Sequence, residues 1–283
     1  MEHSIRVAAV VVTYNRLALL KECLSALYCQ SYKNFDIIVV NNGSNDGTTE
    51  WLANEKGLVV LNQDNCGGAG GFYTGMKYMF EHNYDALWMM DDDGIADSYQ
   101  LENLIDGALK YNLDYANALV VCKDNKTILS DGSSYNKLEI KDYIPKVVCP
   151  FNGTFIWKHV IEKVGMIKRE MYIWGDEREY TARIEKVGFK IGTISSAIHY
   201  HPMFRGDVRL IIPFIKKGRL SFKPSPRDRI FFRNIGYIDR MYHPRKLFVK
   251  YIMYYLLRLK FKQVVYFNKY YKMGYNDDFT EIL

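Results

Sequence analysis

The sequence predicts an α/β fold built on a mainly parallel sheet with helices on both faces. Short apolar runs rich in β-branched residues alternate with segments of helical spacing through the first ninety residues. This alternation implies parallel strands joined by crossover helices. A chain of 283 residues with 48% hydrophobic content is also large enough to bury the core that such a fold needs.

The predicted elements follow one another in a regular order. Over the first ninety residues, the patterns predict strands at 7–12, 37–40, 58–61 and 86–90, and helices at 17–27, 48–54 and 73–82. Further along, they predict a helix at 97–110, short strands and turns over 115–142, a strand at 151–157, a helix at 160–164 and a strand at 191–198. A helix is also predicted at 174–187, because Tyr180, Ile184 and Val187 repeat at helical spacing before Gly188.

Polar clusters follow three of the predicted strands, at residues 13–16, 41–44 and 91–93. Ligands of open parallel sheets bind beyond the carboxyl ends of the strands. We therefore expect the three clusters to converge on one crevice.

The third cluster is a run of three carboxylates, Asp91, Asp92 and Asp93. Adjacent like charges repel each other and resist burial. Three carboxylates directly after a buried strand therefore indicate that a positively charged partner binds there. In an extended segment Asp91 and Asp93 face one side, where two oxygen ligands could meet one Mg²⁺ or Mn²⁺. The alternative is a solvated acidic turn in which Asp93 caps a helix.

Four stretches of the chain, in this order, carry a family resemblance: VVVTYNRLALLKECLSAL, IIVVNNGSNDGT, NQDNCGGAGGFYTGM and ALWMMDDDG. Together they resemble the nucleotide-sugar domain of family 2 glycosyltransferases, which have the GT-A fold. The resemblance covers roughly residues 5–205 and implies an inverting sugar transfer that depends on Mn²⁺ or Mg²⁺. In it, Asp91 and Asp93 are similar to the metal-binding DxD motif, whose cation carries the donor diphosphate.

The resemblance also implies a donor site. Its predicted members are Thr13, Asn15, Arg16, Asn42, Gly67, Gly68, Gly71, Phe72, Asp91, Asp92 and Trp174. The second strand of the family usually ends in an acid pair such as VDDGS, whereas this chain has Asn41 and Asn42; an amide can still hydrogen-bond a pyrimidine or ribose. The glycine-rich segment 65–72 lets backbone approach an anion, and it resembles a loop of bacterial galactofuranosyltransferases. Trp174 either stacks on a sugar or packs.

An inverting transferase needs a base that takes the proton of the acceptor hydroxyl. The family pattern identifies Glu177 as that base, with the adjacent Asp176 as the alternative. Glu179 and Arg183 fit the same pattern but fit a helical i,i+4 ion pair equally well. The family can complete its metal shell with a histidine, and ungapped counting favours His201 over His199. Both histidines should point to the same side of their strand.

The chain changes character after residue 205, where Lys, Arg and aromatic residues interleave. We predict a catalytic domain at 1–205 and a helical, basic region at 206–283. With no nucleic-acid-binding fold beside it, this region does not indicate nucleic acid. Basic amphipathic helices favour a membrane surface, and packing on the catalytic domain or on a second subunit of a homo-oligomer is the alternative. Residues 231–234 (FFRN) resemble an element that follows the catalytic domain in related transferases.

These observations predict an inverting transfer of galactofuranose from UDP-galactofuranose, a UDP-sugar, to a lipid-linked or cell-surface polysaccharide acceptor. The alternatives are a rhamnosyltransferase that uses dTDP-rhamnose and a non-catalytic module that binds nucleotide sugars. The net charge of +6 fits an anionic partner. No leader pattern opens the sequence, and the five cysteines form no CxxC pair. We therefore expect a cytoplasmic enzyme, peripheral at the inner face of the cell membrane.

Overall fold

The protein is described here by a computed structural model, which covers residues 4–126, 128–130, 141–203, 206–212, 218–242 and 246–280. Its strands are β1 Val7–Thr13, β2 Phe35–Asn41, β3 Leu58–Asn62, β4 Ala86–Asp91, β5 Ile95–Ala96, β6 Tyr115–Cys122, β7 Tyr143–Ile144, β8 Thr154–Trp157, β9 Ile191–His201, β10 Asp207–Leu210 and β11 Arg219–Phe222. Its α-helices are α1 Leu17–Tyr28, α2 Thr48–Leu52, α3 Gly67–Glu81, α4 Gln100–Tyr111, α5 Lys158–Val164, α6 Asp176–Val187, α7 Asp228–Met241, α8 Lys246–Leu256 and α9 Phe261–Tyr275. A short 3₁₀ helix spans Arg169–Met171.

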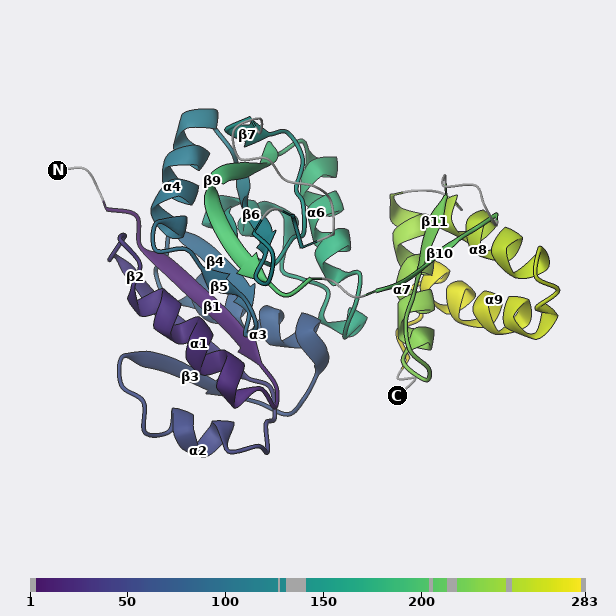
Figure 1. Ribbon diagram of the computed structural model, residues 1–283, viewed down its shortest axis with the longest axis horizontal. Helices are drawn as coiled ribbons and strands as arrows, with labels where there is room; N and C mark the ends of the chain where they lie inside the picture. The colour runs from purple at the N-terminus through teal and green to yellow at the C-terminus, as the bar shows by residue number, and fades with distance from the viewer. Residues whose placement is uncertain are drawn as a thin grey trace. The chain divides into compact units, whose positions relative to one another are not determined.

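The chain divides into two compact units (Figure 1). The first contains residues 1–169 and 180–204, and the second contains residues 170–179 and 205–283. The sequence analysis had assigned segment 170–179 to the catalytic domain. It groups with the C-terminal residues because Arg233 and Asn234 of α7 bind its backbone carbonyls.

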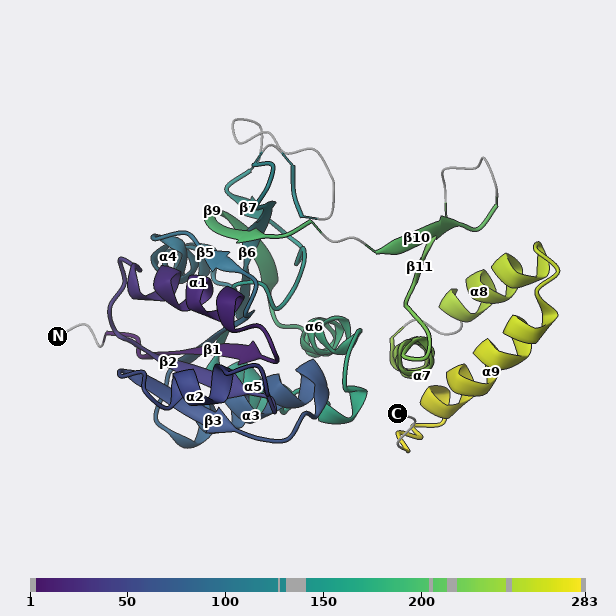
Figure 2. The same cartoon turned by 60° about the horizontal axis from the view of Figure 1, so that its bottom comes forward.

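The first unit is built on one large sheet with the strand order β3-β2-β1-β4-β8-β6-β9-β5, and β7 pairs with β9. The pairs β2–β3, β1–β2, β1–β4 and β6–β9 are parallel, while β8 runs antiparallel between β4 and β6. Figure 2 shows α1 and α4 on one face of the sheet and α3 on the other. The predicted α/β architecture, a mainly parallel sheet flanked by helices, is confirmed.

Alternation along β1 explains how both faces are covered. Val7, Ala9 and Val11 pack in the core that α1 and α4 cover. On the opposite face, a Cβ atom at Gly71 or Gly75 would overlap a valine of β1. These two glycines, one helical turn apart, therefore let α3 approach the sheet closely.

The start of α3 differs from the prediction. The helix was expected at Tyr73, after a glycine-rich loop, but it begins at Gly67. Helix propensity argued against a glycine-rich first turn. Close packing on β1 outweighs that preference, so most of the predicted phosphate loop is helix.

The register of the parallel strands brings the predicted polar clusters together. Thr13 is paired with Asn41, and Asn41 with Asn62. On the other side of β1, Val12 is paired with Asp91. The carboxyl ends of β1, β2, β3 and β4 are therefore neighbours along one edge of the sheet.

The second unit contains a β10–β11 hairpin and helices α7, α8 and α9. Its core is formed largely by aromatic side chains, among them Phe222, Phe232, Tyr251, Tyr254, Tyr255, Phe267 and Tyr271. The helical character of this region was predicted, whereas the hairpin was not. Within the described ranges, no helix combines the length and the apolar character that a membrane span requires.

Candidate active site

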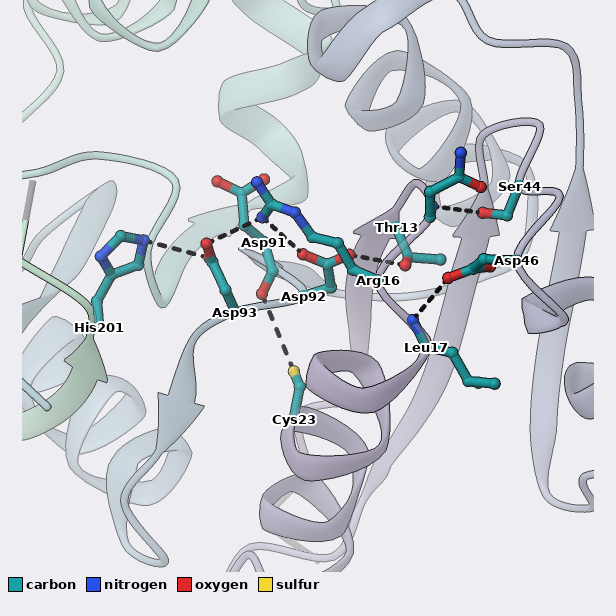
Figure 3. A network of polar contacts seen from close by, with 11 residues as sticks. Thr13, Arg16, Leu17, Cys23, Ser44, Asp46, Asp91, Asp92, Asp93 and His201 are labelled. Atoms are coloured by element: carbon teal, nitrogen blue, oxygen red, sulfur yellow. Dashed lines mark hydrogen bonds and ion pairs between the residues drawn. The ribbon is translucent and has the colours of Figure 1, made fainter. Parts of the chain in front are cut away.

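The acidic triplet lies where β4 ends, facing the end of β1 (Figure 3). Thr13 donates a hydrogen bond from Oγ1 to Asp92 Oδ2 at 2.7 Å. Arg16 Nη1 donates to Asp92 Oδ1 at 3.1 Å and to Asp93 Oδ2 at 2.9 Å. Asp92 therefore ties the triplet to β1, while the half-exposed Arg16 is a cation that bridges two of the three acids.

His201, at the end of β9, is the histidine that contacts the acids. Its Nε2 lies 3.2 Å from Asp93 Oδ1, and its Nδ1 lies 2.6 Å from the carbonyl oxygen of Pro202. Because a carbonyl can only accept, Nδ1 carries the hydrogen and Nε2 is directed toward Asp93. His199 is fully buried beside Gly94, with its Nδ1 3.2 Å from Gln100 Oε1. Both histidines lie next to the triplet region, but only His201 pairs with a carboxylate.

Burial and crowding perturb the pKa values of these groups. Burial, followed by the charges of Asp93 and Asp92, raises the pKa of Asp91 to about 7. Burial also raises the pKa of Asp93, but its pairing with His201 outweighs this and holds the pKa below its usual value. The same pairing raises the pKa of His201 against the opposing effect of burial. For His199, burial lowers the pKa to about 3, so this side chain is neutral.

The donor set fits a divalent cation in its chemistry. Among the residues that the structure describes, no three His, Cys, Asp or Glu side chains are gathered as a ready ion site. Nevertheless, carboxylate oxygens and an imidazole nitrogen are ligands that suit Mn²⁺. Metal-binding histidines commonly donate their other N–H to a carbonyl, as His201 does to Pro202. Asp91, Asp93 and His201 are therefore the residues that could hold the cation.

We expect Mn²⁺ affinity to rise with pH up to about 7. The pKa of Asp91 is raised to about 7, so below that pH a cation must displace a proton. His201, whose pKa is also raised, must lose a proton from the nitrogen that binds the cation, so affinity should fall at least about tenfold for each pH unit below 7. Because the folded-state pKa exceeds the unfolded one, Asp91 alone makes the metal-free protein less stable as pH rises from about 4 to 7. Calorimetric titration at pH 6, 7 and 8 in two buffers would measure affinity and proton release; an affinity independent of pH would contradict this assignment.

The two asparagines after β2 are held by an amide network. Asn41 Nδ2 donates to Thr49 Oγ1 at 2.8 Å and to Asn62 Oδ1 at 2.9 Å. Asn42 is 2% exposed. Its Oδ1 accepts from Gln63 Nε2 at 2.8 Å, and its Nδ2 donates to the Gly67 carbonyl at 3.0 Å. Asn42 thus fastens the start of α3 to β2, and its contact with a donor nucleotide stays a prediction.

We expect Asn42→Asp to destabilise the first unit by about 1–3 kcal/mol, because a carboxylate oxygen would face the Gly67 carbonyl without a hydrogen. Urea unfolding of the variant and of Asp64→Asn, a surface control near the same loop, would measure the difference. Equal stability of both variants would show that the Asn42 donor is dispensable.

The other predicted donor residues of the first unit lie at this edge of the sheet or in α3, whereas Trp174 belongs to the second unit. Asn15 has a positive φ of 52°, and its Oδ1 accepts from the backbone N–H of Asn45 at 2.8 Å. Nothing lies within 4 Å of a Cβ built on Gly68, whereas Phe72 is buried against Phe151. Gly68 therefore presents an open backbone surface at the start of α3, and Phe72 contributes packing.

The predicted base lies in the second unit. Helix α6 begins at Asp176 and not at Trp174, because Tyr172, Trp174 and Gly175 have left-handed φ values of 63°, 64° and 100°. The half-buried Glu177 accepts a hydrogen bond at Oε2 from the backbone N–H of Gly175 at 3.0 Å. Asp176 is 6% exposed and less accessible to an acceptor.

The neighbours of the base have structural contacts. The carboxylate of Glu179 accepts from the Tyr242 hydroxyl at 2.8 Å. In the first unit, Arg183 donates to the carbonyls of Val164 and Met166, both at 3.0 Å. The ammonium of Lys223 lies 4.9 Å from the centre of the Trp174 ring. This contact favours the alternative in which Trp174 packs within the protein over the one in which it stacks on a sugar.

Sequence analysis missed two groups that organise these sites. Gln63 supports Asn42, and Arg233 and Asn234 bind the segment before α6. Only the second group gave a signal in the sequence, because Arg233 and Asn234 belong to the FFRN element, whose resemblance to related transferases came without an assigned role. Its partners lie about sixty residues away along the chain, so pattern alone could not identify them.

Solved structures share this fold. The chain superimposes with a TM-score of 0.60 on residues 1–349 of TarS from S. aureus in complex with UDP, at 15% identity, covering 88% of this chain and 70% of that one. The TM-score is 0.54 for a mannosyltransferase from Pyrobaculum calidifontis in complex with GDP-Man and Mn²⁺, at 14% identity, covering 95% and 70%. In the longer TarS structure the match covers 43% of that chain. The first unit thus has the predicted GT-A glycosyltransferase fold.

The chain belongs to glycosyl transferase family 2, whose family model matches residues 8–172. It is 28% identical to the galactofuranosyltransferase GlfT1 of Mycolicibacterium smegmatis in an alignment of 267 residues that covers 87% of this chain and 87% of that one. It is 29% identical to GlfT1 of Mycobacterium tuberculosis over 260 residues, 85% of this chain and 84% of that one. The predicted resemblance to galactofuranosyltransferases is confirmed.

Proposed function

We propose that this glycosyltransferase transfers galactofuranose from UDP-galactofuranose, with inversion, to a lipid-linked or cell-surface polysaccharide acceptor. The main support for galactofuranose as the donor sugar is the similarity to a galactofuranosyltransferase over 87% of both chains. The glycine-rich segment 65–72 supports the same donor, because the family resemblance extends to it.

The donor is proposed to bind at the edge formed by β1, β2 and β4. Thr13, the last residue of β1, and Asp92, which directly follows β4, are hydrogen-bonded to each other at the ends of these two neighbouring strands. Arg16 is half exposed and can exchange its carboxylate partners for a donor phosphate. The open backbone at Gly68 allows close approach of the donor.

Asp91, Asp93 and His201 would hold Mn²⁺ or Mg²⁺ in this proposal. When bound, such a cation neutralises the negative charge that grows on the departing diphosphate. Asp93 also pairs with Arg16, which follows β1, and with His201, at the end of β9, and so links the ends of these two strands.

Glu177 is proposed as the base. It accepts the proton of the acceptor hydroxyl as the hydroxyl oxygen bonds to the anomeric carbon, while the bond from that carbon to the UDP oxygen breaks. A single displacement of this kind inverts the anomeric configuration. Glu177 is favoured over Asp176 because its carboxylate is more exposed and is already oriented by the Gly175 N–H.

The donor assignment is tested by incubating the purified full chain and Mn²⁺ with UDP-galactofuranose, UDP-galactopyranose or dTDP-rhamnose, and with a synthetic polyprenyl diphosphate-linked glycan. We expect nucleotide release and glycan extension with UDP-galactofuranose. Turnover only with dTDP-rhamnose would establish the rhamnosyltransferase alternative. Donor binding without turnover of any donor would indicate the non-catalytic module.

The proposal includes an anionic membrane surface as the place of reaction, at the cytoplasmic face. Between residues 246 and 276 the chain has seven Lys and Arg and no Asp or Glu. Helices α8 and α9 and their connection also expose a stripe of apolar side chains. These are Val249, Met253, Leu256, Leu257, Leu259, Phe261 and Val265. Apolar insertion combined with Lys attraction is how amphipathic helices bind anionic lipid.

We expect the triple change Leu257→Ser, Leu259→Ser, Phe261→Ser to weaken binding to phosphatidylglycerol vesicles at least about tenfold, because three exposed apolar side chains are lost from the stripe. Vesicle flotation of the full chain measures this. Leu109→Ser with Val187→Ser, two exposed apolar positions of the first unit, is the matched control. Unchanged flotation together with loss of a dimer in light scattering would instead make the stripe a subunit interface.

A further inference from the structure

The segment that precedes the proposed base is bound by one buried amide of α7. Asn234 Nδ2 lies within hydrogen-bond distance of three carbonyl oxygens, those of Met171 at 2.8 Å, Ile173 at 3.1 Å and Trp174 at 2.9 Å, so its two hydrogens are shared among them. The neighbouring Arg233 donates from Nη2 to the carbonyl of Glu170 at 2.9 Å. Asn234 has no exposed surface, so its donating nitrogen is shielded from competition by water.

The segment needs such support because its backbone is irregular. Tyr172 and Trp174 adopt left-handed φ values, which cost free energy in residues other than glycine. A chain in this conformation leaves carbonyls without the partners that a helix or strand would supply. The amide of Asn234 supplies these partners, and its removal would leave buried carbonyls unsatisfied.

One of these bonds leads directly to Glu177. The Trp174 carbonyl and the Gly175 N–H belong to the same peptide group. Asn234 donates to the oxygen of this peptide group. The N–H of the same peptide group, that of Gly175, donates to Glu177 Oε2 at 3.0 Å. Hydrogen bonds linked through one peptide polarise each other, and this pair of bonds connects Asn234 to the carboxylate of Glu177.

Helix α7, which carries Asn234, is held rigidly by its packing against α9. A Cβ atom at Gly236 would overlap the backbone of Tyr271, and one at Gly274 would overlap the backbone of Arg233. The backbones of α7 and α9 therefore touch on either side of Asn234. A side chain on such a pair of helices has little freedom to follow a moving loop.

We propose that Asn234 is a positioning residue that holds the 174–175 peptide and, through it, orients the carboxylate of Glu177 toward the acceptor. The inference rests on the proposed function of Glu177 as the base. This positioning would be the role of the FFRN element, residues 231–234. Its Arg233 contacts the same segment by donating to the carbonyl of Glu170. Asn234 touches neither donor nor acceptor in this proposal.

The test is the Asn234→Asp variant of the full chain, which keeps the shape of the side chain but replaces the donating nitrogen by an acceptor. We expect kcat to fall about 10²-fold with the donor KM unchanged, because misplacing a catalytic group affects the chemical step and not donor binding. Hydrogen exchange of the amides in 172–178 should accelerate, while exchange in β1 and β4 stays as in the parent chain.

Two further variants keep the proposal falsifiable. Arg233→Lys is a milder change in the same element and should lower kcat less than Asn234→Asp. Arg258→Lys is its matched control, since Arg258 also donates to backbone carbonyls of the second unit, those of Leu210, Ile211 and Tyr254, but not to this segment. Faster exchange at 172–178 with unchanged kcat, or a fall in kcat equal to that of Arg258→Lys, would overturn the positioning role. Loss of the Glu177 assignment itself would appear separately, as full activity of Glu177→Gln.

Discussion

Glu177→Gln is expected to lower kcat about 10²–10⁴-fold, the range that removal of a general base usually costs. Glutamine keeps an oxygen that can accept from the Gly175 N–H, so the start of α6 should remain folded. It cannot take a proton from the acceptor hydroxyl. The donor KM should change little, because the base acts on the acceptor and not on the UDP group.

Steady-state UDP release with and without the glycan acceptor measures this effect. Glu185→Gln, the same change at an exposed position of α6, is the matched control. Asp176→Asn separates the two candidates: if it abolishes transfer while Glu177→Gln does not, the base is Asp176. Full activity of both variants would contradict a carboxylate base at the start of this helix.

Much of the first unit could be predicted from apolar runs alone. The run at 86–90 became β4 Ala86–Asp91, because a strand buried on both faces must be apolar along its length. The run at 58–61 became β3 Leu58–Asn62, which is only half-buried at the edge of the sheet but is still rich in β-branched and other apolar residues. The start of α3 could not be predicted in this way. Its glycines disfavour helix locally and are accommodated only because α3 packs so closely on β1.

The site was predictable where it follows from strand ends and not where it depends on distant contacts. Asp91 had to lie beside β1 once the two strands were parallel neighbours. The choice between His199 and His201 depended on which ring reaches Asp93. The sequence could not decide this, because residues two apart in a strand point to the same side of the sheet. The support of the 170–175 segment by Asn234 depends on a tertiary contact, which carries no periodic signal in the sequence.

Asp93→Asn is expected to lower kcat about 10²–10³-fold and to weaken Mn²⁺ binding about 10–100-fold, because it removes a charged ligand and unbalances its neighbours. Asp93 accepts from Arg16 at 2.9 Å and lies 3.2 Å from His201 Nε2. Without this carboxylate, the pKa of His201 should fall toward its ordinary value, because pairing with Asp93 is what raises it against burial. NMR titration of the His201 ring and calorimetry with Mn²⁺ would follow both effects.

Asp92→Asn is the informative comparison, because Asp92 lies next to Asp93 but is committed to Thr13 and Arg16. It should reduce stability and raise the donor KM while changing the Mn²⁺ dissociation constant by only about twofold, since Asp92 supports the ligands without being one. Equal losses of Mn²⁺ affinity in both variants would mean that the triplet acts as a diffuse negative field. A loss confined to Asp93→Asn would support Asp93 as a direct ligand of the cation and Asp92 as a residue that holds the triplet against β1 through Thr13.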